Sequence, residues 1–250
     1  IVDRPIKEST VKADAVDKGE YRHYMLKEIY EQPNAIAEAL EGRFIADKLQ
    51  DSAFGHNAVN VFDKIKAVQI LACGTSYHSG LVAKYWFEKL ARVPCNIEVA
   101  SEFRYREPVL SEDTLIVTIS QSGETADTLA ALLEAKRLGA KYSLAICNVP
   151  ESSLVRESDL VLMTRAGPEI GVASTKAFTT QLVALMLLVI AVGRRFSLSE
   201  EKEAEIRSEL FRLPRIIEDV LQIDTEVKIL SEQFSEKNHA LFLGRGTHYP

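Results

Sequence analysis

The sequence predicts an α/β fold of three layers, in which helices cover both faces of a five-stranded parallel sheet of the flavodoxin-like kind. Further helices flank this sheet on its N- and C-terminal sides. Short apolar runs rich in β-branched residues alternate with stretches of helical apolar spacing, which is typical of right-handed βαβ units. Two of the runs end in turns that combine glycine with hydroxyl residues. The predicted strands cover residues 67–72, 95–99, 114–120, 142–147 and 160–163.

Helices are predicted before the sheet, between its strands and after it. Pro33 separates the first two helices, since proline is favoured in a first helical turn, and Gly139 follows another as a C′ residue. A break is expected before Pro214, because proline removes a helix hydrogen bond. A loop over 167–176 precedes the most apolar helix. The predicted helices cover residues 21–31, 34–41, 59–65, 77–92, 124–138, 152–158, 177–192, 199–213 and 215–234.

Composition excludes several classes of function. The 250 residues are 46% hydrophobic and 26% charged, which indicates a soluble protein with a sizeable core. A net charge of -6 without a dense basic run argues against a nucleic-acid partner. The most apolar stretch, residues 182–192, is too short to span a bilayer, so no membrane partner is expected. Residues 1–20 are too polar for a signal peptide, and a cytoplasmic location is expected.

The three cysteines, Cys73, Cys95 and Cys147, lie far apart and have no metal-binding spacing. Reduced thiols are therefore expected, each serving as a small core residue near a strand. A catalytic cysteine is disfavoured. Neither a metal nor a cofactor is expected.

The turn after the third strand is the first candidate site. Ser120, Gln121, Ser122 and Thr125 surround Gly123, and Ser122 or Gly123 is expected near the N-cap of the next helix. A strand that turns into a helix leaves free amides and the positive end of the helix dipole at one place. Cap residues alone explain part of this pattern. The crowding of donors nevertheless favours a phosphate site.

A second turn, residues 74–76, follows the first strand and carries Thr75 and Ser76. In open parallel sheets, ligands bind at the carboxyl ends of strands where the winding reverses, so the two turns are expected to face one crevice. Gly74 lacks the glycine spacing of a dinucleotide site, although Glu98 falls near the position of a ribose-binding acid. The Walker pattern is absent, so the expected ligand is phosphorylated but is not bound through a nucleotide motif.

Other chemically capable side chains have ordinary structural explanations. His78 near a helix start and Lys176 at the start of the apolar helix are weak candidates for a base and a Schiff-base nucleophile. Glu124 and Glu169 lie near the expected crevice, but the helix dipole favours a carboxylate at a helix start without any chemistry.

The end of the chain repeats its first strand and turn. Residues 240–249 contain an apolar run followed by Gly246, Thr247 and Tyr249, which matches Gly74, Thr75 and Tyr77 at an offset of 246 − 74 = 172 residues. Such a repeat predicts a duplicated domain whose second copy begins here.

Five motifs together resemble the sugar isomerase (SIS) domain of the bacterial glutamine–fructose-6-phosphate aminotransferase family. The similarity extends from residue 19 to residue 250. The motifs are Gly-Thr-Ser-Tyr at 74–77, Ser-Gln-Ser-Gly-Glu-Thr at 120–125, Ala-Ile-Cys-Asn-Val-Pro at 145–150, Ser-Leu-Val-Arg-Glu-Ser-Asp at 153–159 and Glu-Ile-Gly-Val-Ala-Ser-Thr-Lys-Ala-Phe at 169–178.

This resemblance implies a phosphosugar ligand, fructose 6-phosphate or glucosamine 6-phosphate. It assigns the sugar phosphate to Thr75, Ser76, Ser120, Gln121, Ser122 and Thr125. It also assigns a backbone contact with the sugar to Val172 and a supporting role to Ser174. The family's catalytic glutamate, histidine and Schiff-base lysine lie in a second subdomain, and its glutaminase domain contains a cysteine nucleophile. None of these matches a residue here, so no residue of this chain is assigned as catalytic and the chain is expected to be inactive by itself.

The resemblance also implies a domain division and a homodimer. Residues 1–19 correspond to the linker from the glutaminase, 20–196 to the first SIS subdomain, 197–238 to connecting helices, and 239–250 to the start of the second subdomain. The alternative interpretation is a non-catalytic SIS module that senses a phosphosugar. Such a sensor would normally carry an output domain, for example a helix-turn-helix, and the sequence contains no such pattern.

Overall fold

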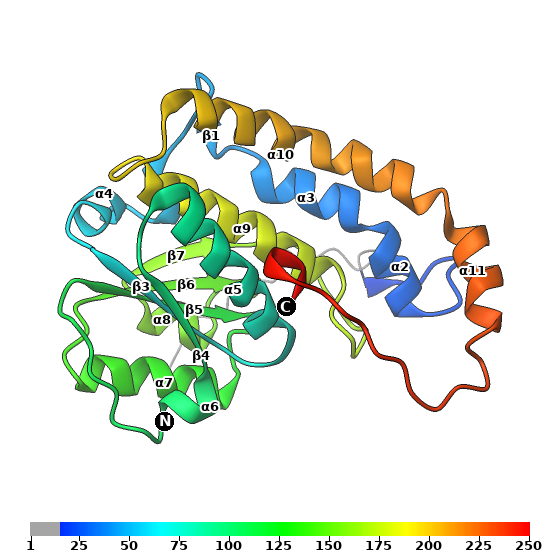
Figure 1. Cartoon of the computed structure of the whole chain (residues 1–250), viewed down its shortest axis with the longest axis horizontal. Helices are drawn as coiled ribbons and strands as arrows, with labels where there is room; N and C mark the ends of the chain where they lie inside the picture. The colour runs from blue at the N-terminus through cyan, green and yellow to red at the C-terminus, as the bar shows by residue number, and fades with distance from the viewer. Residues whose placement is uncertain (1–15) are drawn as a thin grey trace, which may run out of the picture.

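The computed structural model describes residues 16–250 and contains the predicted five-stranded parallel sheet (Figure 1). Its strand order is β4-β3-β5-β6-β7. The strand boundaries agree with the prediction. Strands of a parallel sheet that is covered on both faces are continuous apolar runs, so the ends of each run mark the ends of the strand. The strands are β3 (Ala67–Ala72), β4 (Cys95–Val99), β5 (Thr114–Ser120), β6 (Tyr142–Cys147) and β7 (Leu160–Met163).

Helices cover both faces of the sheet and form the predicted three layers. One face contacts α6 (Ala100–Phe103), α7 (Ala126–Arg137) and α8 (Ser153–Glu157) through a core that includes Leu71, Ile116 and Ala145. The other face packs against α5 (Gly74–Trp86) and α9 (Lys176–Gly193) through Ile70, Val117 and Ile146.

The remaining described elements lie around this core. The helix α3 packs along α9, and α10 packs along α3 as an outer layer (Figure 1). A short hairpin, which the sequence analysis did not predict, connects α3 to the segment before the sheet. These elements are α2 (Tyr24–Tyr30), α3 (Gln32–Leu40), β1 (Phe44–Ile45), β2 (Lys48–Leu49), η1 (Asp51–Phe54), α4 (Ala58–Phe62), the π-helical turn η2 (Phe87–Ala91), α10 (Glu200–Leu221), α11 (Asp224–Glu232) and η3 (Gly246–His248).

The apolar helix α9 is longer than the predicted apolar stretch. By length and composition its 18 residues are sufficient to cross a membrane, yet 78% of them are buried against the rest of the chain. It contacts both α3 and α5. A helix that is apolar on most sides and enclosed in this way is the core helix of the fold.

The helix α10 contradicts the predicted break before Pro214. It continues through Pro214 to Leu221, and Leu210 is buried while Leu213 and Ile217 pack against the same core. A proline inside a helix costs about 3 kcal/mol. Full burial of a large side chain such as Leu210 contributes about 1.5–3 kcal/mol, and the partly buried Leu213 and Ile217 add to this, so the packing of the apolar face outweighs the proline.

Two helix starts and one strand also differ from the prediction. The turn predicted at residues 74–76 is the first turn of α5, and the N-cap of α7 is Thr125 instead of Ser122 or Gly123. The predicted strand at the start of residues 240–249 is wrong: Leu241, Phe242 and Leu243 are exposed and pair with no strand of the described chain. Of the linker predicted at residues 1–19, residues 1–15 lie outside the described part.

Candidate functional site

The predicted turns follow two neighbouring strands at the centre of the sheet. Ala72 of β3 pairs with Ile119 of β5, so the ends of the two strands are level. From β3 the chain winds outward to β4, whereas from β5 it winds through β6 to β7 in the opposite direction. The winding therefore reverses between β3 and β5. The two turns lie at the topological switch point, where ligands bind in open parallel sheets.

The turn after β5 is built by its own hydroxyl groups. The backbone amide of Gly123 donates to Ser120 Oγ (3.0 Å), and Ser120 Oγ lies 2.9 Å from Thr125 Oγ1. Ser120 is only 4% exposed. Of the predicted phosphate contacts, Ser120 and Thr125 thus hold the turn that carries Gln121 and Ser122. This turn occupies residues 121–124 and delays the helix start to Ala126, which explains the shifted N-cap.

Gly123 is required in this turn for two reasons. Its φ of +68° lies in the left-handed region, which side chains with a Cβ rarely adopt. A Cβ atom would also lie 2.0 Å from Ser152 Oγ and 2.7 Å from Cys147 Sγ. The close contact with β6 and with the residue before α8 leaves room only for hydrogen.

Several donors at this edge of the sheet remain free for a ligand. Ser122 Oγ accepts a hydrogen bond from the Glu124 amide (3.2 Å), which leaves its hydroxyl proton free to donate. Thr75 is exposed, and Gln121 is half-buried. Neither side chain forms a hydrogen bond with another described residue. The N-termini of α5 and α7 lack side-chain caps and contribute free amides with the positive ends of their dipoles.

Ser76 is placed differently from Thr75. It is 8% exposed, and its Oγ accepts a hydrogen bond from Gln181 Nε2 of α9 (3.0 Å). Gln181 Oε1 in turn accepts from Ser79 (3.3 Å). Ser76 therefore connects the first turn of α5 to the core helix, and its hydroxyl proton remains available as a donor.

Asn148 links the β5 turn to the loop after β7. Its backbone amide donates to the backbone carbonyl oxygen of Gln121 (3.2 Å), and its side-chain Nδ2 donates to the backbone carbonyl oxygen of Gly167 (2.8 Å). Its Oδ1 accepts from the Ala166 amide (2.7 Å). Asn148 lies in the motif at residues 145–150, but no role was predicted for it; its position directly after β6 was the available signal.

The loop at residues 167–176 presents Val172 to solvent. Ser174 Oγ donates to Glu169 Oε2 (3.2 Å), while Glu169 Oε1 accepts from the Thr175 and Ala177 amides (2.9 and 3.0 Å). Glu169 thus caps the start of α9, which agrees with the interpretation that the helix start favours a carboxylate without any chemistry. Ser174 is half-exposed and is joined to Glu169 by its Oγ hydrogen bond.

Lys176 and Glu124 are also engaged in structural contacts. Lys176 is 3% exposed and its Nζ pairs with Glu31 Oε2 at 2.7 Å, so this lysine lies away from solvent with a carboxylate partner. Glu124 Oε1 accepts from the Ser153 amide (2.7 Å), and this hydrogen bond lowers the pKa of the carboxyl. Both contacts explain these residues without a catalytic role.

Burial shifts the pKa values of two of the three thiols. Desolvation raises the pKa of Cys95 and of Cys147, which keeps both thiols protonated. Cys73 is partly exposed beside Gly74 at the site. Among residues 16–250, no group of acidic, histidine or cysteine side chains has the geometry of a metal site.

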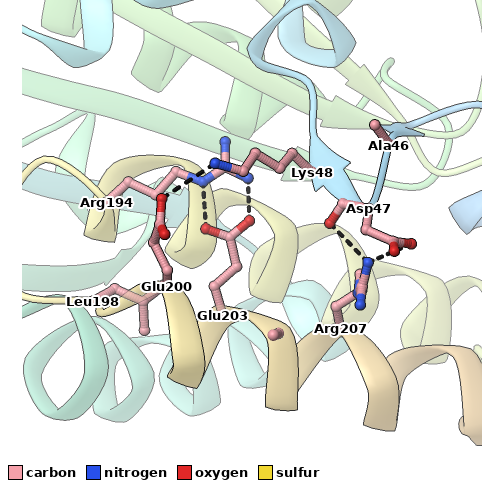
Figure 2. Close-up of a pocket in the computed structure, with 9 residues that line it drawn as sticks. Ala46, Asp47, Lys48, Arg194, Leu198, Glu200, Glu203 and Arg207 are labelled. Atoms are coloured by element: carbon pink, nitrogen blue, oxygen red, sulfur yellow. Dashed lines mark hydrogen bonds and ion pairs between the residues drawn. The ribbon is translucent and has the colours of Figure 1, made fainter.

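A separate hollow of about 460 Å³ lies between the β1–β2 hairpin and α10 (Figure 2). Its three cations each face a carboxylate of the same hollow, and none of the predicted site residues lines it. Because the charges are already paired, we interpret these ion pairs as contacts that hold the hairpin and the end of α9 against α10. The pairs are Lys48 with Glu200, Arg194 with Glu203, and Arg207 with Asp47.

Comparison with known proteins finds consistent matches. A model of the family described as SIS domain matches residues 62–191. The glutamine–fructose-6-phosphate aminotransferase (isomerizing) of Shewanella oneidensis is 57% identical over 249 residues, and that of Pseudomonas putida is 61% identical over 239. These alignments cover 100% and 95% of this chain but only 41% and 39% of those proteins, so the chain spans about two-fifths of their length.

A solved structure has the same fold. The C-terminal domain of glucosamine-fructose-6-phosphate aminotransferase from Francisella tularensis superposes with a TM-score of 0.91 at 49% identity. The match covers 93% of this chain and 65% of that one.

Proposed function

The chain belongs to the SIS domain family, and from this premise we propose that it is the sugar-phosphate-binding half of the isomerase part of a glutamine–fructose-6-phosphate aminotransferase. The complete enzyme would convert fructose 6-phosphate and glutamine into glucosamine 6-phosphate and glutamate. The names of the relatives support this activity. The observation that carries the binding role is the convergence of two uncapped helix starts and their hydroxyl donors at the switch point of the sheet.

The phosphate dianion would lie between the turns after β3 and β5. Thr75, Gln121 and Ser122 would donate from side chains that have free protons, together with the first amides of α5 and α7. Each charge-assisted hydrogen bond contributes about 1.5–3 kcal/mol, so a few of them discriminate a phosphate from a neutral hydroxyl. Ser120 and Thr125 would contribute chiefly by holding the turn.

The sugar would extend toward the loop at residues 167–176. Val172 would offer its backbone to the sugar, with Ser174 and Glu169 fixing the loop behind it. We assign no catalytic residue to this chain. The chemistry would require the second SIS subdomain and a glutaminase domain, so the chain alone is expected to bind hexose 6-phosphates without converting them.

We propose further that residues 239–250 begin the second SIS subdomain. The backbone supports this proposal, because Gly246 has a φ of +62° after an extended Arg245, just as Gly74 has a φ of +57° after an extended Cys73. In both places a helical turn follows. A cytoplasmic homodimer completes the proposal and rests on the family alone.

Isothermal titration calorimetry tests the phosphate site directly. Fructose 6-phosphate and glucosamine 6-phosphate are titrated into the chain, into Ser122→Ala and into the control Ser231→Ala, which alters an exposed serine of α11. Loss of one charge-assisted bond should weaken binding of both phosphosugars roughly 10- to 100-fold in Ser122→Ala alone. Unchanged affinity in Ser122→Ala would mean that this turn is an ordinary cap, and isomerisation of fructose 6-phosphate by the chain would contradict the division of labour.

A further inference from the structure

A buried carboxylate from the N-terminal helix α2 holds the loop that carries Val172. Glu28 is only 2% exposed. Its Oε1 accepts hydrogen bonds from the backbone amides of Ile170 (2.6 Å) and Gly171 (3.0 Å). Two consecutive amides of an irregular loop thus converge on one carboxylate oxygen from a distant part of the chain.

Gly171 shows how closely this loop lies on α2. A Cβ atom at this position would be 2.5 Å from Glu28 Oε2 and 3.4 Å from the Cα of Met25. Glu28 Oε2 is buried and has no hydrogen-bond partner among the described residues. Burial of a carboxylate is costly unless hydrogen bonds replace those that it made with water. The two loop amides supply such hydrogen bonds to Oε1, which ties the buried carboxylate to the loop.

The end of the same loop is held from the same side. Lys176 Nζ pairs with Glu31 Oε2 at 2.7 Å, and Glu31 directly follows α2. The lysine side chain is 4% exposed and the glutamate side chain 31%. Consequently, two carboxylates one helical turn apart restrain the middle and the end of the loop.

We propose that Glu28 is a positioning residue, which sets the place of Val172 and Ser174 relative to the phosphate-binding turns. This inference rests on the proposed function, because it assigns the loop to the sugar portion of the ligand. Glu28 itself is buried beneath the loop, so it would act through the loop and not by direct contact with the ligand. A binding loop restrained in advance loses less conformational freedom when the ligand binds. Glu28 therefore favours the hexose portion without contributing to phosphate binding.

The test compares Glu28→Ala, Glu28→Gln and the control Glu38→Gln, which alters an exposed glutamate of α3. Calorimetry with fructose 6-phosphate and with inorganic phosphate separates the sugar contribution from the phosphate contribution. We expect Glu28→Ala to weaken fructose 6-phosphate binding roughly tenfold with little change for inorganic phosphate. Glu28→Gln retains an acceptor oxygen and should recover most of the affinity. Gly171→Ala should weaken fructose 6-phosphate binding as Glu28→Ala does. The double variant should bind fructose 6-phosphate no more weakly than either single variant.

Hydrogen exchange provides a readout that requires no ligand. In Glu28→Ala the amides of Ile170 and Gly171 should exchange faster, while those of the β5 turn at residues 121–125 should not change. Unchanged exchange at Ile170 and Gly171 would overturn the proposal, as would an equal loss of affinity for both ligands. An unaltered chain that binds neither ligand would instead count against the proposed function, and the exchange result would still decide the role of Glu28.

Discussion

Replacement of Gly123 by alanine should destabilise the fold through two separable effects. A residue with a Cβ in the left-handed region costs about 1–2 kcal/mol, and Gly123 has a φ of +68°. The new Cβ would also lie 2.0 Å and 2.5 Å from Oγ and Cβ of Ser152 and 2.7 Å from Cys147 Sγ. Overpacking of this kind costs about 1–3 kcal/mol. The free energy of unfolding should therefore fall by about 2–5 kcal/mol.

Urea denaturation followed by circular dichroism measures this change. Gly139→Ala is the matched control, because its φ is +98° but a Cβ there would meet no atom within 4 Å. Gly139→Ala should report the backbone cost alone. Gly123→Ala combined with Ser152→Gly should recover part of the loss, since two of the three nearest atoms belong to Ser152. If Gly123→Ala is no more destabilising than Gly139→Ala, the close packing of the β5 turn against β6 is not the reason for this glycine.

Two further predictions concern titration and thiol reactivity. The Ser153 amide lowers the pKa of Glu124 from its ordinary 4.5, so the carboxylate stabilises the fold above that pH. This contribution is lost as the pH falls through the lowered pKa, and Glu124→Gln should therefore lose less stability than the parent in urea unfolding as the pH is reduced below about 4.5. An equal loss of unfolding free energy with falling pH in Glu124→Gln and in the parent would contradict this prediction. Cys73 should be the first of the three thiols to react with a disulfide reagent, whereas burial should protect Cys95 and Cys147 until the chain unfolds. Fructose 6-phosphate should slow the reaction of Cys73.

The five strands were predictable because each is specified by a local apolar run that fits only a sheet covered on both faces. The positions of the two turns followed from glycine and hydroxyl residues directly after β3 and β5, and strand order then brought them together. The roles of the hydroxyls within one turn were not predictable. Ser120 and Ser122 are equivalent in the sequence, but the inward direction of Ser120 makes it a brace of the turn.

Other differences arose where long-range packing decides a local outcome. Pro214 locally favours a break, yet the apolar face that α10 buries against the core carries the helix through it. The apolar run within residues 240–249 locally favours a strand, but a strand requires a partner for its backbone groups, and the described chain supplies none. Lys176 and Glu169 appeared chemically capable because their carboxylate and amide partners could not be seen in sequence.

The α/β class, the strand positions, the hydroxyl-rich segments after β3 and β5 and the family resemblance were predictable because they depend on residues close together in the chain. Only the tertiary structure revealed that Glu28, 142 residues before Ile170, lies beneath the loop that follows β7. Pairing between segments so far apart depends on the packing of complete layers. No local spacing in the sequence marks Glu28 as different from the exposed glutamates around it.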